Sequence, residues 1–257
     1  MSVEEKPVLL RADAVAKHFG GVKALRDVTL SIRRGEIYGL IGPNGAGKTT
    51  FFNCMTGLYI PDGGGFVFDG TPLKADAPHQ AAEMGIARTF QNIRLFGNMT
   101  ALENVMVGRH VRTKAGVFGA MFLNKATRDE EAAIRQRALD LLHYVDIADR
   151  AEDLAKNLSY GDQRRLEIAR ALATEPKLLC LDEPAAGMNA TETEELRLLI
   201  EGIRKDGTTV LLIEHDVKLV MGLCDRVAVL DYGELVIEDV PAVVQKDQRV
   251  IEAYLGA

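Results

Sequence analysis

Residues 42–49 read Gly-Pro-Asn-Gly-Ala-Gly-Lys-Thr and fit the pattern G-x-x-x-x-G-K-[ST] without a gap. They follow a compact apolar run at 36–41, and helix-compatible sequence continues from Lys48. Because glycines keep Cβ atoms away, the backbone N–H groups of such a loop can surround a phosphate, helped by the dipole of the following helix. The Lys48 ammonium would reach the β- and γ-phosphates, and the Thr49 hydroxyl would ligate Mg²⁺. The sequence therefore predicts a nucleoside triphosphate site between a buried strand and a helix.

Strand-like and helix-like segments alternate in the C-terminal part of the chain. Apolar runs predict strands at 178–182, 209–214 and 226–231, and helical spacing predicts helices at 191–205 and 216–224. Uninterrupted apolar strands in alternating βα units are typical of a parallel sheet with helices on both faces. The predicted fold class is therefore α/β.

The N-terminal part has a different sequence pattern. Residues 8–33 contain short strand-like runs that are broken by the turn signal at Gly20 and Gly21. The run IPDGGG at 60–65 predicts a turn, after which strand character resumes at 66–68.

A helical block separates the glycine loop from the later βα units. Charged and aliphatic residues recur at helical spacing over 128–144, and 163–174 predicts another helix. We interpret residues 92–170 as a helical lobe inserted into an α/β core that comprises 1–91 and 171–257.

Two adjacent carboxylates, Asp182 and Glu183, stand where the apolar run at 178–181 stops. Ligands of open α/β sheets bind at the carboxyl ends of the strands. Asp182 is thus predicted to hold Mg²⁺ through water, and Glu183 to act as the general base on the attacking water. Strands often end in an acid, so the pair gains its meaning only together with the glycine loop.

The segment LSYGDQ at 158–163 opens a predicted helix. Ser159 and Asp162 have capping-box spacing, and a well-capped helix explains both. It does not explain Gly161, which is a poor helix former in a first turn. A glycine there makes sense if a ligand must approach the backbone closely.

These motifs together resemble the ABC ATPase family: the glycine loop, LSYGDQ ahead of LLCLDEP, and an isolated His215 after TVLLIE. The resemblance covers almost the whole chain. It implies one ABC ATPase domain over 1–257, a P-loop NTPase core with an antiparallel β-subdomain and an inserted α-helical subdomain that carries the signature. It also implies an ATP sandwich dimer, in which Ser159 and Gly161 contact the γ-phosphate of the ATP held by the other subunit.

The resemblance assigns three further positions. Gln91 matches the Q-loop glutamine, which senses Mg²⁺ and water, although a lone glutamine in a loop would ordinarily carry no such role. His215 matches the switch histidine near the γ-phosphate, where the alternative is a capping or packing residue. Phe19 lies where the family places an aromatic ring on adenine, and the alternative is a core phenylalanine.

The predicted site therefore has three groups of residues. The catalytic residues are Glu183, His215 and Gln91, and the Mg²⁺ ligands are Thr49, Gln91 and Asp182. The residues predicted to bind ATP are Phe19, Gly42, Asn44, Gly45, Gly47, Lys48, Thr49, Thr50, Ser159 and Gly161.

Three residues depart from the family pattern. Tyr160 and Asp162 stand within the signature, where the family consensus is LSGGQ. Asn189 stands where the family usually has aspartate, in a loop that the resemblance places across the dimer interface.

Longer segments, among them 87–110 and 158–174, resemble the ATPase subunit of bacterial branched-chain amino acid uptake systems and, less completely, the ATPase of lipopolysaccharide export. The resemblance implies transmembrane permease subunits, a second identical or different ATPase subunit, and indirectly a solute-binding protein outside the membrane. It implies a peripheral position on the cytoplasmic face of the inner membrane. Within 91–106, apolar side chains are predicted either to receive a short permease helix or to pack the lobe's own core: Ile93, Leu95, Phe96, Met99 and Leu102.

Composition limits the alternatives. The net charge of −6 argues against a nucleic-acid partner, and three scattered cysteines without a CxxC pair fit reduced thiols. The longest stretch without a charged residue, 49–61, is too short for a membrane span, which needs ~20 residues. A soluble ABC protein usually has two ATPase domains or a long coiled coil. A GTPase should show NKxD, and a kinase has no use for Glu183 or for LSYGDQ.

Overall fold

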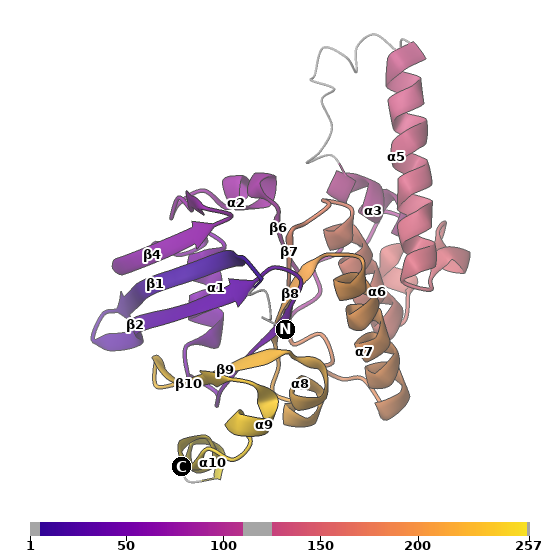
Figure 1. Cartoon of the computed structure of the whole chain (residues 1–257). Coiled ribbons are helices and arrows are strands. Elements are labelled where there is room, and N and C mark those ends of the chain that lie inside the picture. The colour runs from indigo at the N-terminus through magenta and orange to yellow at the C-terminus, as the bar shows by residue number, and fades with distance from the viewer. Residues whose placement is uncertain (1–5, 110–124, 256–257) are drawn as a thin grey trace. The chain divides into compact units, whose positions relative to one another are not determined.

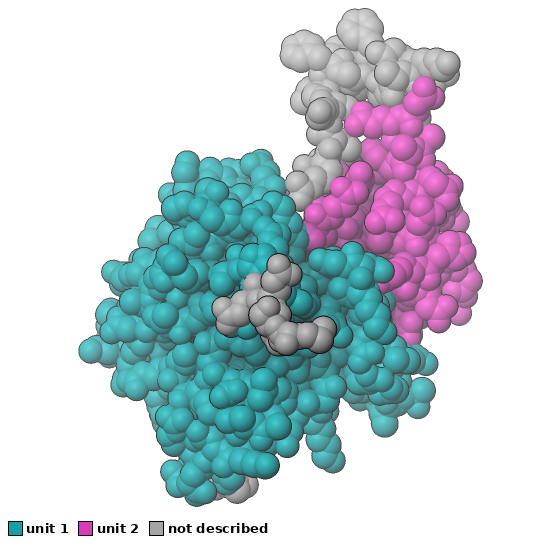
Figure 2. All heavy atoms as spheres, in the orientation of Figure 1, with its two compact units in different colours: residues 1–86, 177–257 teal, residues 87–176 magenta. Residues whose placement is uncertain are grey.

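The computed structural model describes residues 6–109 and 125–255, so that part of the predicted helical block, 110–124, lies outside the described residues. The chain divides into two compact units, coloured separately in Figure 2. The first unit comprises residues 1–86 and 177–257, and the second comprises residues 87–176. The sequence had suggested boundaries at 91/92 and 170/171. The two units are described one at a time.

The centre of the first unit is a six-stranded sheet in the order β10-β9-β3-β8-β7-β6. Its strands β9, β3, β8 and β7 pair in parallel, and β10 runs antiparallel to β9. Strands β3, β7 and β8 are buried along their whole length because both faces of the sheet are covered. The strands are β3 (Ile37–Ile41), β6 (Ile86–Arg88), β7 (Leu178–Asp182), β8 (Thr209–Ile213), β9 (Arg226–Asp231) and β10 (Glu234–Asp239). Of β6, only Ile86 belongs to the first unit, because the second unit begins at Ala87.

A second, antiparallel sheet has the order β2-β1-β4-β5, and β1, β2 and β4 lie side by side in Figure 1. Its strands are β1 (Val8–Phe19), β2 (Val22–Arg33), β4 (Gly63–Phe68) and β5 (Thr71–Pro72). The expected class is confirmed: an α/β core with an antiparallel β-subdomain and a separate helical part.

The prediction of a turn over 60–65 was wrong in its second half, because Gly63, Gly64 and Gly65 belong to β4. A Cβ atom on Gly64 would lie 2.2 Å from the carbonyl oxygen of Ala14. Ala14 has a positive φ of 46°, and the β1–β4 register shifts beside it. The glycines thus allow a close approach of two strands at a bulge rather than ending the strand.

Helices cover the first unit's sheets. They are α1 (Lys48–Met55), α2 (Pro78–Met84), α7 (Ala190–Lys205), α8 (Val217–Leu223), α9 (Pro241–Val244) and α10 (Gln248–Leu255). Phe51 and Phe52 of α1 are fully buried, and burial of such a side chain stabilises the fold by about 1.5–3 kcal/mol. Asn189 caps α7: its side chain accepts from the Glu192 backbone, and the Glu192 carboxylate accepts from the Asn189 backbone. Asparagine caps a helix as well as aspartate does, so the departure from the family pattern leaves α7 well capped.

The second unit is a packed group of helices. Its elements are α3 (Ala101–Arg109), α5 (Lys125–Tyr144), α6 (Tyr160–Leu172) and the short 3₁₀ turns Ala148–Arg150 and Ala155–Asn157. Helix α3 packs against both α5 and α6. At Gly108, an added Cβ would lie 2.3 Å from the carbonyl oxygen of Arg170, so the glycine lets α3 and α6 approach closely.

The described residues of both units contain no helix with the length and apolar character that a membrane span requires. The three cysteines Cys54, Cys180 and Cys224 are buried and form no disulfide. Burial raises the pKa of the Cys54 thiol to about 11, which keeps it protonated at neutral pH.

Candidate functional site

The glycine loop joins the end of β3 to the start of α1, as its sequence predicts. Gly42, Gly45 and Gly47 all have positive φ, at 149°, 82° and 102°. A Cβ on Gly42 would lie 2.1 Å from the Leu230 carbonyl oxygen, and a Cβ on Gly47 would lie 2.6 Å from that of Ala24. A Cβ on Gly45 would meet no atom within 4 Å. Two of the glycines are therefore required by packing against the protein itself, and Gly45 marks the open side of the loop.

Lys48 is buried inside this loop. Its ammonium donates to the carbonyl oxygens of Gly42 (2.6 Å) and Pro43 (2.9 Å). Burial lowers the pKa of Lys48, and the nearby carboxylates Glu183 and Asp182 oppose that shift. The charge attraction between Lys48 and these carboxylates indicates that the lysine and both strand-end acids lie in one region of the first unit.

The start of α1 leaves backbone donors available. Its N-cap position is Gly47, and no side chain caps it with a hydrogen bond. The first N–H groups of a helix have no intrahelical acceptor, and together with the helix dipole they favour an anion. Thr49 is exposed in this first turn, Thr50 is half-buried, and Asn44 is exposed in the loop.

Asp182 is the last residue of β7 and is buried, and Glu183 follows it in a strained conformation. Glu183 has a φ of 46°, which is rare for a residue with a side chain. Its backbone N–H donates to the Ile213 carbonyl oxygen at the end of β8 (2.8 Å). Such strain costs about 1–3 kcal/mol and persists only where the surrounding structure enforces it. Here it sets the direction of the Glu183 carboxylate.

His215 lies beside that carboxylate. Its Nδ1 is 3.7 Å from Oε2 of Glu183 and 3.8 Å from Oε2 of Glu214. The His215 side chain is 61% exposed, so it is accessible from solvent rather than packed in the core. The structure therefore brings together two residues that the sequence singled out separately, Glu183 and His215.

Glu214 was not predicted from the sequence. It is 1% exposed, and it accepts from the Ala185 N–H with Oε1 (2.8 Å) and from the His215 N–H with Oε2 (3.1 Å). Burial raises the pKa of Glu214, and these backbone donors oppose the rise. Glu214 thus links the loop after Glu183 to the residue His215. The signal that identified Asp182, an acid at the end of an apolar strand, applies to Glu214 as well.

Phe19 ends β1 and is 44% exposed, which excludes the core alternative. Its ring meets the ring of Tyr59 edge-on, with centroids 5.3 Å apart, and the Lys17 ammonium lies 5.4 Å from the Phe19 centroid. Tyr59 was not predicted, because it lies in the loop after α1, far from Phe19 in sequence. The two aromatic side chains form an accessible edge-to-face pair.

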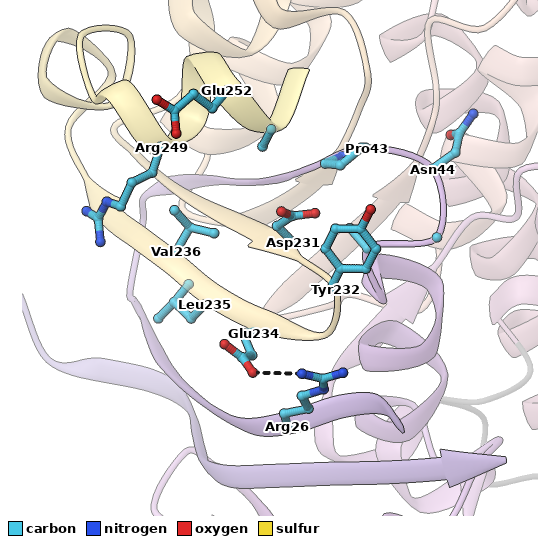
Figure 3. Close-up of a pocket in the computed structure, with 13 residues that line it drawn as sticks. Arg26, Pro43, Asn44, Asp231, Tyr232, Glu234, Leu235, Val236, Arg249 and Glu252 are labelled. Carbon is cyan, nitrogen blue, oxygen red and sulfur yellow. Dashed lines mark hydrogen bonds and ion pairs between the residues drawn. The ribbon is translucent and has the colours of Figure 1, made fainter. Parts of the chain in front are cut away.

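A cavity of about 860 Å³ opens beside the glycine loop, where the loop faces the β9–β10 turn and α10 (Figure 3). Asn44 and Gly45 line it together with the β9–β10 turn and α10, and Arg26 and Glu234 form an ion pair at its edge (3.1 Å). It lies on the β9 side of β3, whereas Asp182 and Glu183 stand at the end of β7, which lies on the β8 side of β3. The cavity is thus separate from the acids.

The remaining predicted residues, Gln91, Ser159 and Gly161, lie in the second unit. Ser159 caps α6: its hydroxyl accepts from the Asp162 N–H (3.2 Å) and donates to the Asp162 carboxylate (2.7 Å). The expected capping spacing is therefore real. Ser159 and Gln91 are exposed, and Gly161 is half-buried.

Comparisons with known proteins decide the family. The family model described as ABC transporter matches residues 25–186. The chain belongs to the ABC transporter family. Within that family it is an ATP-binding and ATP-hydrolysing component, as the glycine loop and the strand-end acids require.

The chain is similar to ABC transporter proteins over nearly its whole length. The high-affinity branched-chain amino acid transport ATP-binding protein LivG of Salmonella typhimurium (strain LT2) is 46% identical, covering 96% of this chain and 98% of LivG. The lipopolysaccharide export system ATP-binding protein LptB of Haemophilus influenzae is 34% identical, covering 96% of this chain and 97% of LptB.

Solved structures of ATP-binding cassettes are also similar to this chain. A nucleotide-free ATP-binding cassette from an ABC transporter is 30% identical with a TM-score of 0.84, covering 97% of this chain and 100% of that one. A dimeric post-hydrolysis state of the ATP-binding cassette MJ0796, bound to ADP and Pi, is 27% identical with a TM-score of 0.77, covering 91% of this chain and 99% of that one.

Proposed function

We propose that this ABC transporter ATPase powers the uptake of branched-chain amino acids from the cytoplasmic face of the membrane. The LivG relative, which is named for that transport, is more similar to the chain than the LptB relative is. The substrate would be selected by permease subunits and by a solute-binding protein outside the membrane. The chain itself supplies the energy and contacts no amino acid.

The arrangement in the first unit supports a division of labour during hydrolysis. The loop N–H groups and Lys48 hold the phosphates, with Gly45 at the open side of the loop. Glu183 would polarise the attacking water, and His215, 3.7 Å from that carboxylate, would act at the γ-phosphate. The proximity of Glu183 and His215, in the same unit as the buried Lys48, is the observation that carries this proposal.

The oxygen ligands of the first unit are suited to Mg²⁺ that binds together with ATP. The described residues hold no group of three or more His, Cys, Asp or Glu side chains that could bind a metal alone. Mg²⁺ is usually held by one or two protein oxygens together with phosphates and water, which matches the Thr49 hydroxyl and Asp182. Gln91 stays a predicted ligand on the resemblance alone. Bound Mg²⁺ would neutralise charge that develops on the phosphates.

A second subunit, identical or different, would complete each site. Ser159 and Gly161 lie at the first turn of α6, where backbone donors and the helix dipole favour an anion, and Ser159 is exposed. In this proposal they contact the γ-phosphate of the ATP in the other subunit. The similarity to a dimeric cassette bound to ADP and Pi supports it.

The permease contact is proposed for the apolar segment of the second unit. Phe96 is 48% exposed and Met99 is 37% exposed, whereas Leu102 is 1% exposed and belongs to the core. The exposed pair would receive a short permease helix. We expect Phe96→Asp to abolish co-purification with permease subunits, while an exposed control, Tyr144→Asp, retains it. Intact co-purification and ATPase activity of Phe96→Asp would remove this surface from the proposal.

The hydrolytic assignment is tested with Glu183→Gln. The variant keeps the phosphate loop, so it should bind ATP and accumulate as an ATP-bound dimer with little turnover. Sedimentation with ATP and a phosphate-release assay measure the two effects, and Glu192→Gln in the α7 cap serves as a control. Wild-type turnover by Glu183→Gln would remove its role as general base.

A further inference from the structure

Helix α6 buries a charged pair that the proposed chemistry does not use. The side chains of Arg164 and Glu167, one turn apart, are both 0% exposed, and Arg164 Nη1 lies 3.0 Å from Glu167 Oε2. Removing two charges from water costs more than their mutual attraction alone usually returns. Such a pair is retained when further polar groups complete it, so its other partners indicate its role.

Those partners are the backbone groups around Gln91. Arg164 donates through Nη1 to the Phe90 carbonyl oxygen (2.7 Å) and through Nη2 to the Gln91 carbonyl oxygen (2.9 Å). Oε1 of Glu167 accepts from the N–H groups of Phe90 and Arg94, each at 3.3 Å. The pair therefore binds backbone on both sides of Gln91, and all of these residues belong to the second unit.

Additional contacts fix the same segment. The Phe90 ring lies 4.9 Å from the Arg88 guanidinium and 4.6 Å from that of Arg94. Cation–π contacts of this kind contribute about 0.5–1 kcal/mol each at accessible sites. The backbone that carries Gln91 is thus held from α6 and from its own flanking residues.

The same arginine also reaches the tip of α6. Arg164 Nη2 donates to the hydroxyl of Tyr160 (3.0 Å), and its guanidinium lies 5.7 Å from the Tyr160 ring. Tyr160 stands between Ser159 and Gly161, at one of the two signature positions where this chain departs from the family consensus. The departure thus has a specific partner, and one guanidinium connects the Gln91 carbonyl to the signature tip.

We propose that Arg164 and Glu167 are positioning residues that clamp the Gln91 segment to α6, and that the Tyr160 hydroxyl extends this clamp to the Ser159 tip. A displacement of the Gln91 segment is then passed to Ser159 through one rigid body instead of being absorbed by a flexible loop. The inference rests on the proposed function, in which Gln91 and Ser159 act on ATP. It adds the residues that connect them.

Mild substitutions separate positioning from simple stabilisation. Arg164→Lys keeps the charge but cannot reach all four acceptors with its single ammonium, and Tyr160→Phe removes only a hydroxyl. Arg165→Lys is the matched control, because Arg165 is the next residue of α6 and donates to a backbone carbonyl of Val145 (3.0 Å), away from Gln91. Removing Arg164 entirely is avoided, since the buried Glu167 would keep only the more distant Arg170 guanidinium, at 3.9 Å.

The experiment measures kcat and KM for ATP in the complex of the full chain with its co-purified permease subunits, together with the melting temperature. We expect Arg164→Lys to lower kcat about tenfold and Tyr160→Phe about threefold, with KM changed less than about twofold, because the nucleotide is held by the first unit. Arg165→Lys should leave kcat within about twofold of wild type.

Two outcomes would contradict the proposals in distinguishable ways. If Arg164→Lys and Tyr160→Phe keep the wild-type kcat and only melt earlier, the pair is structural and the clamp is overturned. Ser159→Ala is assayed in parallel. If Ser159→Ala loses turnover while the clamp variants do not, only the clamp fails. If Ser159→Ala turns over like wild type, the composite ATP site of the proposed function fails instead.

Discussion

The glycine loop of the first unit and the serine tip of the second unit both begin a helix, but they are built differently. The loop depends on unusual backbone: Gly42 and Gly47 have positive φ, and Glu183 nearby is strained. At the tip, Ser159 caps α6 through ordinary side-chain hydrogen bonds, and the backbone from Ser159 to Gln163 has no positive φ.

The two sites differ in what fixes the positions of their functional groups. In the first unit, backbone conformation and the buried Lys48 fix the site without any partner. In the second unit, the tip is a regular helix start, and a buried ion pair beneath it holds its surroundings. A strained loop therefore indicates a functional site by itself. A well-capped helix start indicates one only when the ligand or partner that it binds is known. Each of the following predictions changes one side of this comparison.

The largest effect is expected from Lys48→Ala. The variant loses the charge that meets the phosphates and removes the ammonium donor of the Gly42 and Pro43 carbonyl oxygens, of which Pro43 keeps the Ala46 N–H. We expect ATP affinity to fall about 100-fold, equivalent to ~2.7 kcal/mol, in titration calorimetry of the isolated chain. Lys23→Ala, an exposed lysine of β2, should bind ATP normally. Wild-type affinity in Lys48→Ala would show that the loop does not hold the phosphates.

A different pattern is expected from Ser159→Ala. Its turnover should fall at least about tenfold while ATP affinity of the isolated chain stays within about twofold, because the serine acts on nucleotide held by another subunit. Loss of the α6 cap should also lower stability by about 1 kcal/mol. Thr100→Ala is the matched control, since Thr100 caps α3 of the same unit by accepting from the Glu103 N–H (3.1 Å). Equal losses of turnover in both variants would reduce the effect to stability.

The smallest effect is expected from Glu214→Gln, which tests the support of the strained side. Burial raises the pKa of Glu214 above the ordinary value of a glutamate, 4.5, so the folded state holds its proton more tightly than the unfolded state does. The free energy of unfolding should therefore fall as the pH rises from 4.5 through the raised pKa. Glu214→Gln cannot ionise and should lose this part of the pH dependence.

Urea denaturation across that pH range measures the difference between wild type and Glu214→Gln. At neutral pH the variant should also lose about 1 kcal/mol, because its amide nitrogen cannot accept one of the two backbone N–H groups. Glu234→Gln, an exposed member of a surface pair, is the control. Identical pH profiles for wild type and Glu214→Gln would mean that burial does not raise the pKa of Glu214.

Much of the core could be predicted because its signals are local. The strand at 178–182 was predicted at its observed bounds, since a buried parallel strand is a continuous apolar run. Helix α6 begins at Tyr160, three residues earlier than predicted, because Ser159 is its N-cap. The glycine strand β4 was missed, since glycine ordinarily breaks strands and the reason for Gly64 is a carbonyl group that is distant in sequence.

The residues of the candidate site could likewise be predicted only where a local motif marks them. Lys48, Asp182, Glu183 and His215 stand in or beside motifs whose chemistry dictates their residue types. Tyr59 and the pair Arg164–Glu167 have no such motif, because their roles depend on which segments the fold brings against them. Glu214 lies between these cases: its position after an apolar strand was visible, but its hydrogen bonds to two loops were not.

The central claim is that each ATP is held by the loop of one subunit and completed by the Ser159 tip of another. Mixing Lys48→Ala chains with Ser159→Ala chains tests it most directly, at a concentration at which the wild-type chain hydrolyses ATP. In a mixed dimer one site carries both changes and the other carries neither, so the mixture should hydrolyse ATP much faster than either variant does alone. If the mixture stays as inactive as its components, the site does not combine residues of two subunits and the account is wrong.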